Sequence, residues 1–207
     1  MIVYIIKAAD VSSLPYETLN ALMPERCSKA EKFLREGDKL MSLGAGLLIH
    51  ALLGISERSL QYTSFGKPYT ESGVHFNVSH SGGYSMLAYD SSPVGADIEQ
   101  IKEYDNKLVP FIFSETEQQW INNSPQKRFY YLWSIKESIM KAVGSGMNLE
   151  PLSVKTDPER SELILNDRQW YYRYTEWNGC SIAVASAKPF DDITIKLLSP
   201  SELKVLI

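Results

Sequence analysis

The chain contains 207 residues, of which 44% are hydrophobic and 22% are charged, a composition typical of globular proteins. This balance excludes a collagen, a coiled coil and a largely disordered chain, and the length allows one large domain or two small ones. The formal net charge is −4, from 21 basic and 25 acidic residues. We therefore expect no broad basic surface for nucleic acid, and an anionic ligand needs a local cluster of cations.

The location of the protein is inferred from its apolar segments and its cysteines. Residues 2–6 lack the flanking basic region and cleavage site of a signal peptide, so we interpret them as a strand. Cys27 and Cys180 have neither metal-ligand spacing nor a disulfide framework, which fits a reducing compartment. The longest apolar run, residues 40–55, is shorter than the roughly 20 residues that span a bilayer. We expect a cytoplasmic protein without a membrane segment.

The first half of the chain predicts helices followed by strands. Pro24 is placed to begin a helical region that extends to about Gly54, with a break at Gly37 between a charged surface helix and an apolar core helix. Short turns then separate three β-rich runs, which predict an antiparallel meander. These runs are residues 74–80, 84–89 and 94–101.

The second half repeats this order. Ser114 and Glu117 have the spacing of a capping box, and Ser124 followed by Pro125 predicts a second helix start. That helix should end near Gly144, a residue type favoured at helix C-termini. Four strands are then predicted at residues 162–165, 169–174, 180–187 and 193–198.

The repeated order predicts an α+β fold of two similar, pseudo-duplicated halves. Each half would carry helices packed on an antiparallel sheet of about three strands. We place the halves at residues 1–102 and 103–207, and no flexible linker separates them. The interface between two tightly packed halves is the expected location of a binding site.

Two carboxylates stand out in the segment VGADIE. The two-residue period of a strand puts Asp97 and Glu99 on one face, with Ala96 and Ile98 on the other. Like charges held this close in an apolar strand require a cation or a metal ion nearby. A solvated strand edge is the alternative.

A third carboxylate lies in a helical segment. Trp133, Glu137 and Lys141 follow one another at intervals of four residues and share one helix face. An ordinary surface ion pair is the alternative, but Trp133 and Met140 favour a partly buried face. Asp97, Glu99 and Glu137 together form the incomplete oxygen shell that Mg²⁺ completes with water and phosphate oxygens.

Other residues point to phosphate binding. The segment NVSHSGG ends a strand in a glycine-rich turn, where Ser79, His80 and backbone N–H groups can converge on an anion. The sequence contains no P-loop, GxGxxG or HExxH motif. The candidate phosphate-binding cations are Arg26, Lys29, Lys67 and Lys141.

Five segments in order resemble the Sfp-type 4′-phosphopantetheinyl transferases. They are PERCSKAEKF, FGKPY, FNVSHSG, VGADIE and FYYLWSIKESIMKAVGSG. The resemblance implies a monomer that binds coenzyme A and Mg²⁺, with Mn²⁺ as an alternative, in a cleft between its halves. It implies transfer of the phosphopantetheine arm to a serine of an acyl or peptidyl carrier protein, with release of adenosine 3′,5′-bisphosphate.

The resemblance also implies roles for individual residues. Asp97, Glu99 and Glu137 would hold the metal ion, and Lys141 would pair with the phosphates. Glu137 is the candidate base for the serine proton, directly or through a water molecule. The remaining residues would contact the phosphates or the adenosine end: Arg26, Lys29, Lys67, Ser79 and His80.

One position departs from the family pattern. The family commonly has an arginine before a Ser or Thr early in the core helix, and this chain has Met41 followed by Ser42. That change predicts a weaker grip on the 3′-phosphate. Two alternatives to the transferase stay open, the first suggested by Met41 and the second by the three carboxylates. One is a homologue that binds coenzyme A or a carrier without catalysis, and the other is a Mg²⁺-dependent phosphohydrolase.

The sequence also suggests where a carrier protein docks and which kind of carrier it is. Residues 104–120 are the expected docking surface, on the basis of the family resemblance. Because the chain is acidic overall, docking should depend on local basic and apolar patches. The KES variant of the helix motif favours a carrier of secondary metabolism.

Overall fold

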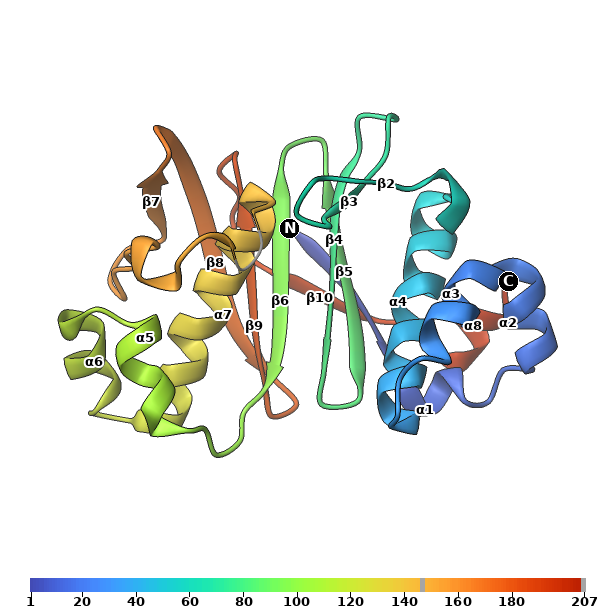
Figure 1. Cartoon of the computed structure of the whole chain (residues 1–207), viewed down its shortest axis with the longest axis horizontal. Coiled ribbons are helices and arrows are strands. Elements are labelled where there is room, and N and C mark those ends of the chain that lie inside the picture. Colours follow the sequence, from blue (N-terminus) through green and yellow to red (C-terminus); the bar gives the residue numbers. More distant parts are fainter. Residues whose placement is uncertain (146–147, 206–207) are drawn as a thin grey trace.

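The computed structural model describes residues 1–145 and 148–205 and contains two four-stranded sheets (Figure 1). The first sheet has the order β10 (Thr194–Leu197), β1 (Ile2–Lys7), β5 (Tyr84–Asp90) and β4 (His75–Ser81). The second has the order β6 (Val94–Gln100), β9 (Cys180–Ser186), β8 (Arg168–Trp177) and β7 (Glu162–Leu165). A small hairpin joins β2 (Gln61–Tyr62) to β3 (Pro68–Tyr69).

Helices cover the outer face of each sheet (Figure 1). The N-terminal helices are α1 (Ala8–Val11), α2 (Tyr16–Leu22), α3 (Pro24–Ala30) and α4 (Glu36–Leu53). The later helices are α5 (Val109–Ile112), α6 (Glu115–Ile121), α7 (Pro125–Val143) and α8 (Pro200–Val205). Short 3₁₀ helices are η1 (Glu57–Ser59), η2 (Asn106–Leu108) and η4 (Pro151–Ser153).

The predicted α+β class is confirmed, and several helix boundaries agree with the sequence signals. Pro24 begins α3, and Pro125 begins α7. Gly54 and Gly144 follow α4 and α7 with φ angles of 65° and 86°, the left-handed conformation that glycine favours. The last residue of the long helix motif, Gly146, lies outside the described residues. The break predicted at Gly37 is misplaced, because α4 already begins at Glu36.

The predicted meander is wrong at its third strand. β4 and β5 form the expected antiparallel pair, but β6 pairs with β9 in the second sheet. Both edges of β5 are occupied, one by β1 and the other by β4, so β6 has no free edge of β5 to join. The first sheet in turn gains β10, which runs parallel to β1. Each sheet therefore contains one strand from the other side of residue 102.

Side chains of β4 link the two sheets where their edge strands meet. The N–H groups of Ala96 and Gln100 donate to Asn77 Oδ1 and Ser81 Oγ, at 2.9 and 3.1 Å. Between them, the N–H of Ile98 donates to Ser79 Oγ at 3.3 Å. Polar side chains at every second residue of β4 thus take the place of a backbone ladder along β6.

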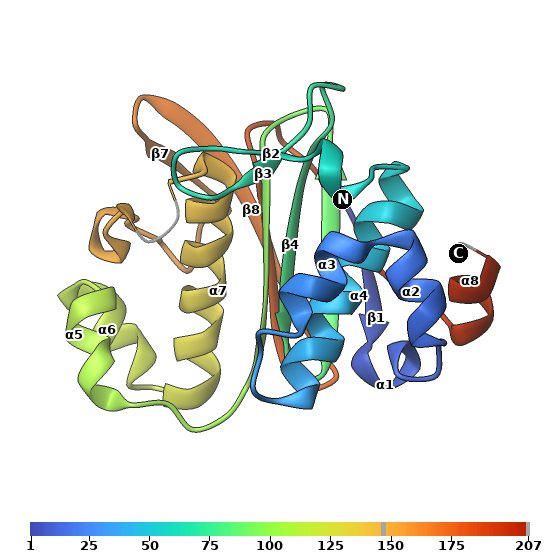
Figure 2. The same cartoon turned by 45° about the vertical axis from the view of Figure 1, so that its right-hand side comes forward.

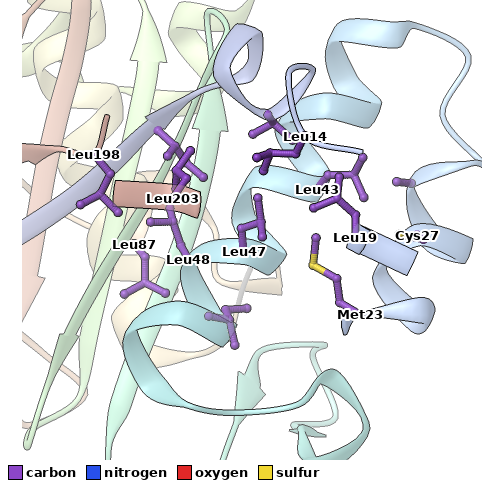
Figure 3. Packing of buried hydrophobic residues seen from close by; sticks show 14 of the residues in the cluster. Leu14, Leu19, Met23, Cys27, Leu43, Leu47, Leu48, Leu87, Leu198 and Leu203 are labelled. Carbon is purple, nitrogen blue, oxygen red and sulfur yellow. The ribbon is translucent and has the colours of Figure 1, made fainter. Parts of the chain in front are cut away.

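Alternate residues of each strand build separate cores. Val3 and Ile5 of β1 pack with Ala96 and Ile98 of β6 between the two sheets. Ile6 faces the other way, into the cluster beneath α1–α4 and α8. Figure 3 shows that cluster, in which leucines of α4 meet the buried side chains of the N-terminal helices.

Helix α7 lies unusually close to β6. An ideal Cβ built on Gly95 would lie 2.0 Å from the carbonyl oxygen of Ser138 and 2.3 Å from the nitrogen of Ala142. Only a residue without a side chain permits this approach. The contact places the α7 face that carries Glu137 and Lys141 beside the β6 face that carries Asp97.

Within residues 1–145 and 148–205, no helix is both long enough and apolar enough to cross a membrane.

Candidate active site

A pocket of about 370 Å³ lies between the two groups of helices. Helices α3 and α4 stand on one side and α7 on the other, with β4 and β6 between them (Figure 2). The structure brings together eight of the nine sequence-predicted site residues here, and Lys67 lies elsewhere. Five further residues line the pocket: Phe33, Ser42, Ala45, Val78 and Trp133.

The acidic end of the pocket is organised around Lys141. Its Nζ lies 2.6 Å from Asp97 Oδ1, 3.1 Å from Ser79 Oγ and 3.9 Å from Glu137 Oε2. Ser79 Oγ in turn donates to Asp97 Oδ1 at 3.0 Å. Glu99 accepts a hydrogen bond of 2.9 Å from Ser81 Oγ. The predicted carboxylates and lysine therefore belong to one charged cluster.

The local environment changes how these groups hold protons. Burial, together with the charges of Asp97 and Glu99, raises the pKa of Glu137 to about 7 against the opposing effect of Lys141. Burial and the charge of Asp97 also raise the pKa of Glu99. Burial lowers the pKa of Lys141, but the attraction of Asp97 and Glu137 outweighs it, so the pKa of Lys141 is raised overall. Lys141 stays protonated, and Glu137 can gain or lose a proton near neutral pH.

One oxygen of the cluster is left for a ligand. Asp97 is 1% exposed, and in residues 1–145 and 148–205 no hydrogen-bond partner reaches its buried Oδ2. The same residues contain no group of three or more His, Cys, Asp or Glu side chains that holds a metal ion unaided. The donor set therefore fits a hard cation that takes one or two protein carboxylates and completes its shell with ligand oxygens, as Mg²⁺ does.

The Ser79 hydroxyl is already engaged by the protein. It donates to Asp97 and accepts from Lys141 and from the Ile98 N–H, which uses its hydrogen and both lone pairs. The sequence predicted a phosphate contact for Ser79. In the structure, the hydrogen bonds of this side chain hold Asp97 and the backbone of β6 in place.

The other end of the pocket is basic. Arg26 and Lys29 of α3 line it together with Ser42 of α4, and His80 of β4 is within reach of the charges of both Lys141 and Arg26. Arg26 is buried and makes a bidentate ion pair with Glu57, with both N–O distances at 2.7 Å. Burial and the charge of Arg26 lower the pKa of Lys29. Desolvation by the surrounding protein and the charge of Lys141 lower the pKa of His80, which favours its neutral imidazole.

Lys67 does not line this pocket. Its Nζ donates to the carbonyl oxygens of Val94 and Ala142, at 3.1 and 3.0 Å, and so ties the β2–β3 hairpin to β6 and α7. Burial lowers the pKa of Lys67 to about 8. This ammonium belongs to a separate cavity that Trp170 and Arg168 also line. The sequence around Lys67 did not show which of the two cavities this side chain lines.

The sequence analysis missed a buried ion pair between α6 and α7, next to the site residue Glu137. Lys136 is fully buried and donates to Glu117 Oε2 at 2.9 Å and to the Val154 carbonyl at 2.7 Å. Glu117 also closes the predicted capping box with Ser114. Lys136 lies directly before Glu137 on α7, so this pair ties that turn of the helix to α6 and to Val154. The signal was present as the lysine inside the motif W-x-x-K-E-S, for which no role was predicted.

A family model described as the 4′-phosphopantetheinyl transferase superfamily matches residues 93–187. This segment begins just before β6 and ends after β9, and it includes the acidic end of the pocket.

Three curated proteins illustrate the similarity. The 4′-phosphopantetheinyl transferase gsp of Aneurinibacillus migulanus is 33% identical over 144 residues, 65% of this chain and 61% of that protein. The 4′-phosphopantetheinyl transferase Sfp of Bacillus subtilis is 28% identical over 89% of this chain and 91% of that protein. The L-aminoadipate-semialdehyde dehydrogenase-phosphopantetheinyl transferase of Rattus norvegicus is 26% identical over 83% of this chain and 69% of that protein.

Proposed function

This chain belongs to the 4′-phosphopantetheinyl transferase superfamily, and we propose that it transfers the phosphopantetheine arm of coenzyme A to a serine hydroxyl of an acyl or peptidyl carrier protein. The observation that carries the proposal is the pocket between α3–α4 and α7. Its α7–β6 side carries the carboxylates and Lys141, and its α3 side carries Arg26 and Lys29. A ligand with a pyrophosphate and a second phosphate along its length matches this division of charge.

The charged groups divide the work of the reaction. The serine oxygen would form a new bond to the β-phosphorus of coenzyme A, and the bond from that phosphorus to the bridging oxygen would break. Adenosine 3′,5′-bisphosphate would leave with the bridging oxygen and its electron pair. Lys141, held beside Asp97 at 2.6 Å, is placed to stabilise the negative charge that develops on the phosphate oxygens.

The serine proton needs an acceptor in the same pocket. Glu137 is 15% exposed, and its pKa of about 7 suits a group that takes a proton near neutral pH. It lies on α7 within 3.9 Å of the Lys141 ammonium. We assign the proton to a carboxylate oxygen of Glu137.

Asp97, together with Glu99 or Glu137, would hold a divalent cation, Mg²⁺ or Mn²⁺, whose other ligands would be water and phosphate oxygens. Such an ion would neutralise the pyrophosphate and make the bisphosphate a better leaving group. The buried, unpartnered Oδ2 of Asp97 supports this assignment.

The carrier would dock beside the acidic end of the pocket. In the segment 104–120, the side chains of Leu108 and Phe111 are 48% and 74% exposed. Tyr104 and Trp120, by contrast, pack on Phe129 and Tyr131. We therefore narrow the expected docking surface to the exposed apolar residues of η2 and α5.

The dependence of product release on the carrier tests this function. We expect adenosine 3′,5′-bisphosphate to appear from coenzyme A and Mg²⁺ only when an apo carrier is present, as chromatography would measure. Release without a carrier would identify a phosphohydrolase. Binding of coenzyme A without release, across carriers of fatty acid, polyketide and peptide synthesis, would identify a non-catalytic homologue.

A further inference from the structure

A carboxylate pairs with the buried arginine that lines the basic side of the pocket. Glu57, in η1, accepts a hydrogen bond of 2.7 Å from Arg26 Nε with one oxygen, and its other oxygen lies 2.7 Å from Arg26 Nη2. The two side chains are 9% and 8% exposed. A bidentate pair at this distance acts on a more distant ion as a dipole, because the carboxylate cancels most of the field of the guanidinium.

The fold keeps Arg26 in this pair. A Cβ built on Gly46 of α4 would lie 2.6 Å from Arg26 Cγ and 3.0 Å from Met23 Sδ, so the arginine stem lies tightly against the helix. Glu57 holds the guanidinium at the other end of the arginine side chain. Arg26 therefore stays in the pocket wall together with its counter-charge.

Two N–H groups of Arg26 point to Glu57, and a guanidinium has five. The remaining donors are able to bind an anion, although the net charge of the pair is zero. A phosphate at this end meets the positive charge of Lys29, the neutral pair and the imidazole of His80. The phosphate is therefore attracted by one positive charge fewer than a count of the basic residues suggests.

We propose that Glu57 is a specificity-determining residue. Its carboxylate offsets Arg26, lowers the affinity of this end of the pocket for a phosphate monoester, and so sets how strongly the enzyme prefers coenzyme A to 3′-dephospho-coenzyme A. This inference rests on the proposed function, because it places the adenosine end of coenzyme A at Arg26 and Lys29.

The substitution Glu57→Gln tests the inference, because it removes the charge and keeps the size of the side chain. The quantity measured is the ratio of the dissociation constant of 3′-dephospho-coenzyme A to that of coenzyme A, by calorimetry at low salt. We expect Glu57→Gln to raise this ratio on the order of tenfold, since a full charge near a protein surface acts with an effective dielectric of about 20. An unchanged or lower ratio would overturn the proposal.

Glu25→Gln is the matched control. Glu25 of α3 pairs with Arg58 of η1, so this pair joins the same two helices with acid and base exchanged. The pair is outside the pocket, and 75% of the Arg58 side chain is exposed. The substitution removes the same charge from the same helix contact. We expect the ratio for Glu25→Gln to equal that of the wild type, and a rise equal to that of Glu57→Gln would contradict a local role.

A second pair of variants keeps the inference testable if Glu57→Gln does not fold. Arg26→Gln leaves the Glu57 carboxylate unpaired in the pocket wall, so the ratio should fall below the wild-type value. Removing that carboxylate as well, in Arg26→Gln/Glu57→Gln, should raise the ratio part of the way back to the wild-type value. If the double variant has the same ratio of dissociation constants as Arg26→Gln, the role of Glu57 is only structural.

The binding assay separates this inference from the proposed function. A protein that binds both ligands with the expected ratios but transfers nothing contradicts the transferase reaction alone. A protein that transfers phosphopantetheine with a ratio insensitive to Glu57 contradicts the specificity role alone. Wild-type protein that binds neither ligand contradicts both.

Discussion

Gly95 of β6 lies directly against the backbone of Ser138 in α7, so closely that a Cβ on Gly95 would be 2.0 Å from the Ser138 carbonyl oxygen. This contact between a glycine and a helix backbone positions the candidate active site. It sets Glu137 and Lys141 of α7 beside Asp97, two residues after Gly95 on the same face of the strand.

Gly95→Ala should therefore move α7 away from β6. The methyl group cannot be accommodated by a side chain that shifts, because it meets backbone atoms. We expect a loss of about 3 kcal/mol in the free energy of unfolding, the upper end of the usual cost of overpacking, measured by urea denaturation, and a loss of transfer activity.

Gly37→Ala is the control for that measurement. Gly37 lies in the first turn of α4, and a Cβ there meets nothing within 4 Å. Because alanine favours the helical conformation, this variant should gain up to about 1 kcal/mol. Equal destabilisation of the two variants would contradict the role given to the Gly95 contact.

Ser79→Ala tests the side-chain ladder between β4 and β6. The buried N–H of Ile98 would lose its acceptor, which costs about 1–3 kcal/mol. Transfer activity should also fall, because Asp97 and Lys141 lose a shared partner. Ser81→Ala is the comparison, since water can reach the exposed Gln100 and replace the lost bond. A Ser81→Ala variant as unstable as Ser79→Ala would contradict this account.

Lys136→Met should be strongly destabilising although Lys136 is not in the pocket. It leaves the carboxylate of Glu117 buried without its cation, which costs about 3–5 kcal/mol. The double variant Lys136→Met/Glu117→Gln removes both charges and should recover part of that loss in thermal denaturation. If the double variant is less stable than Lys136→Met, the ion pair is not the cause.

The same pair predicts an acid-sensitive stability. Burial raises the pKa of Glu117. The charge of Lys136 and the hydrogen bonds from Thr156, Lys136 and Ser114 lower it by a larger amount, so the folded-state pKa lies below the ordinary 4.5. The stabilisation is therefore present above pH 4.5 and lost as the pH falls through the folded-state pKa. Urea midpoints measured against pH should decline less steeply in the double variant, and parallel declines would contradict this assignment.

Much of this site could be predicted because its residues follow local rules. Asp97 and Glu99 share a face through the period of the strand, and Glu137 and Lys141 share one through the period of the helix. The capping box of Ser114 and Glu117 is likewise local, and the structure confirms it.

Long-range relationships could not be predicted in this way. A turn before β6 suggested a hairpin with β5, but the pairing of β1 with β5 decides that this edge is occupied. The pairing of Arg26 with Glu57 joins residues 31 positions apart, and no local pattern marks it. The period-two polar residues Asn77, Ser79 and Ser81 were visible, but their role required knowing which strand lies beside β4.

The transferase function is tested by the mass of an apo carrier protein after incubation with this protein, coenzyme A and Mg²⁺. We expect an increase of about 340 Da, the mass of one phosphopantetheine group, with wild-type protein. No increase is expected with folded Asp97→Ala or Glu137→Ala. An unchanged mass for every carrier of a broad panel would contradict the transferase function, and full modification by both variants would contradict the site.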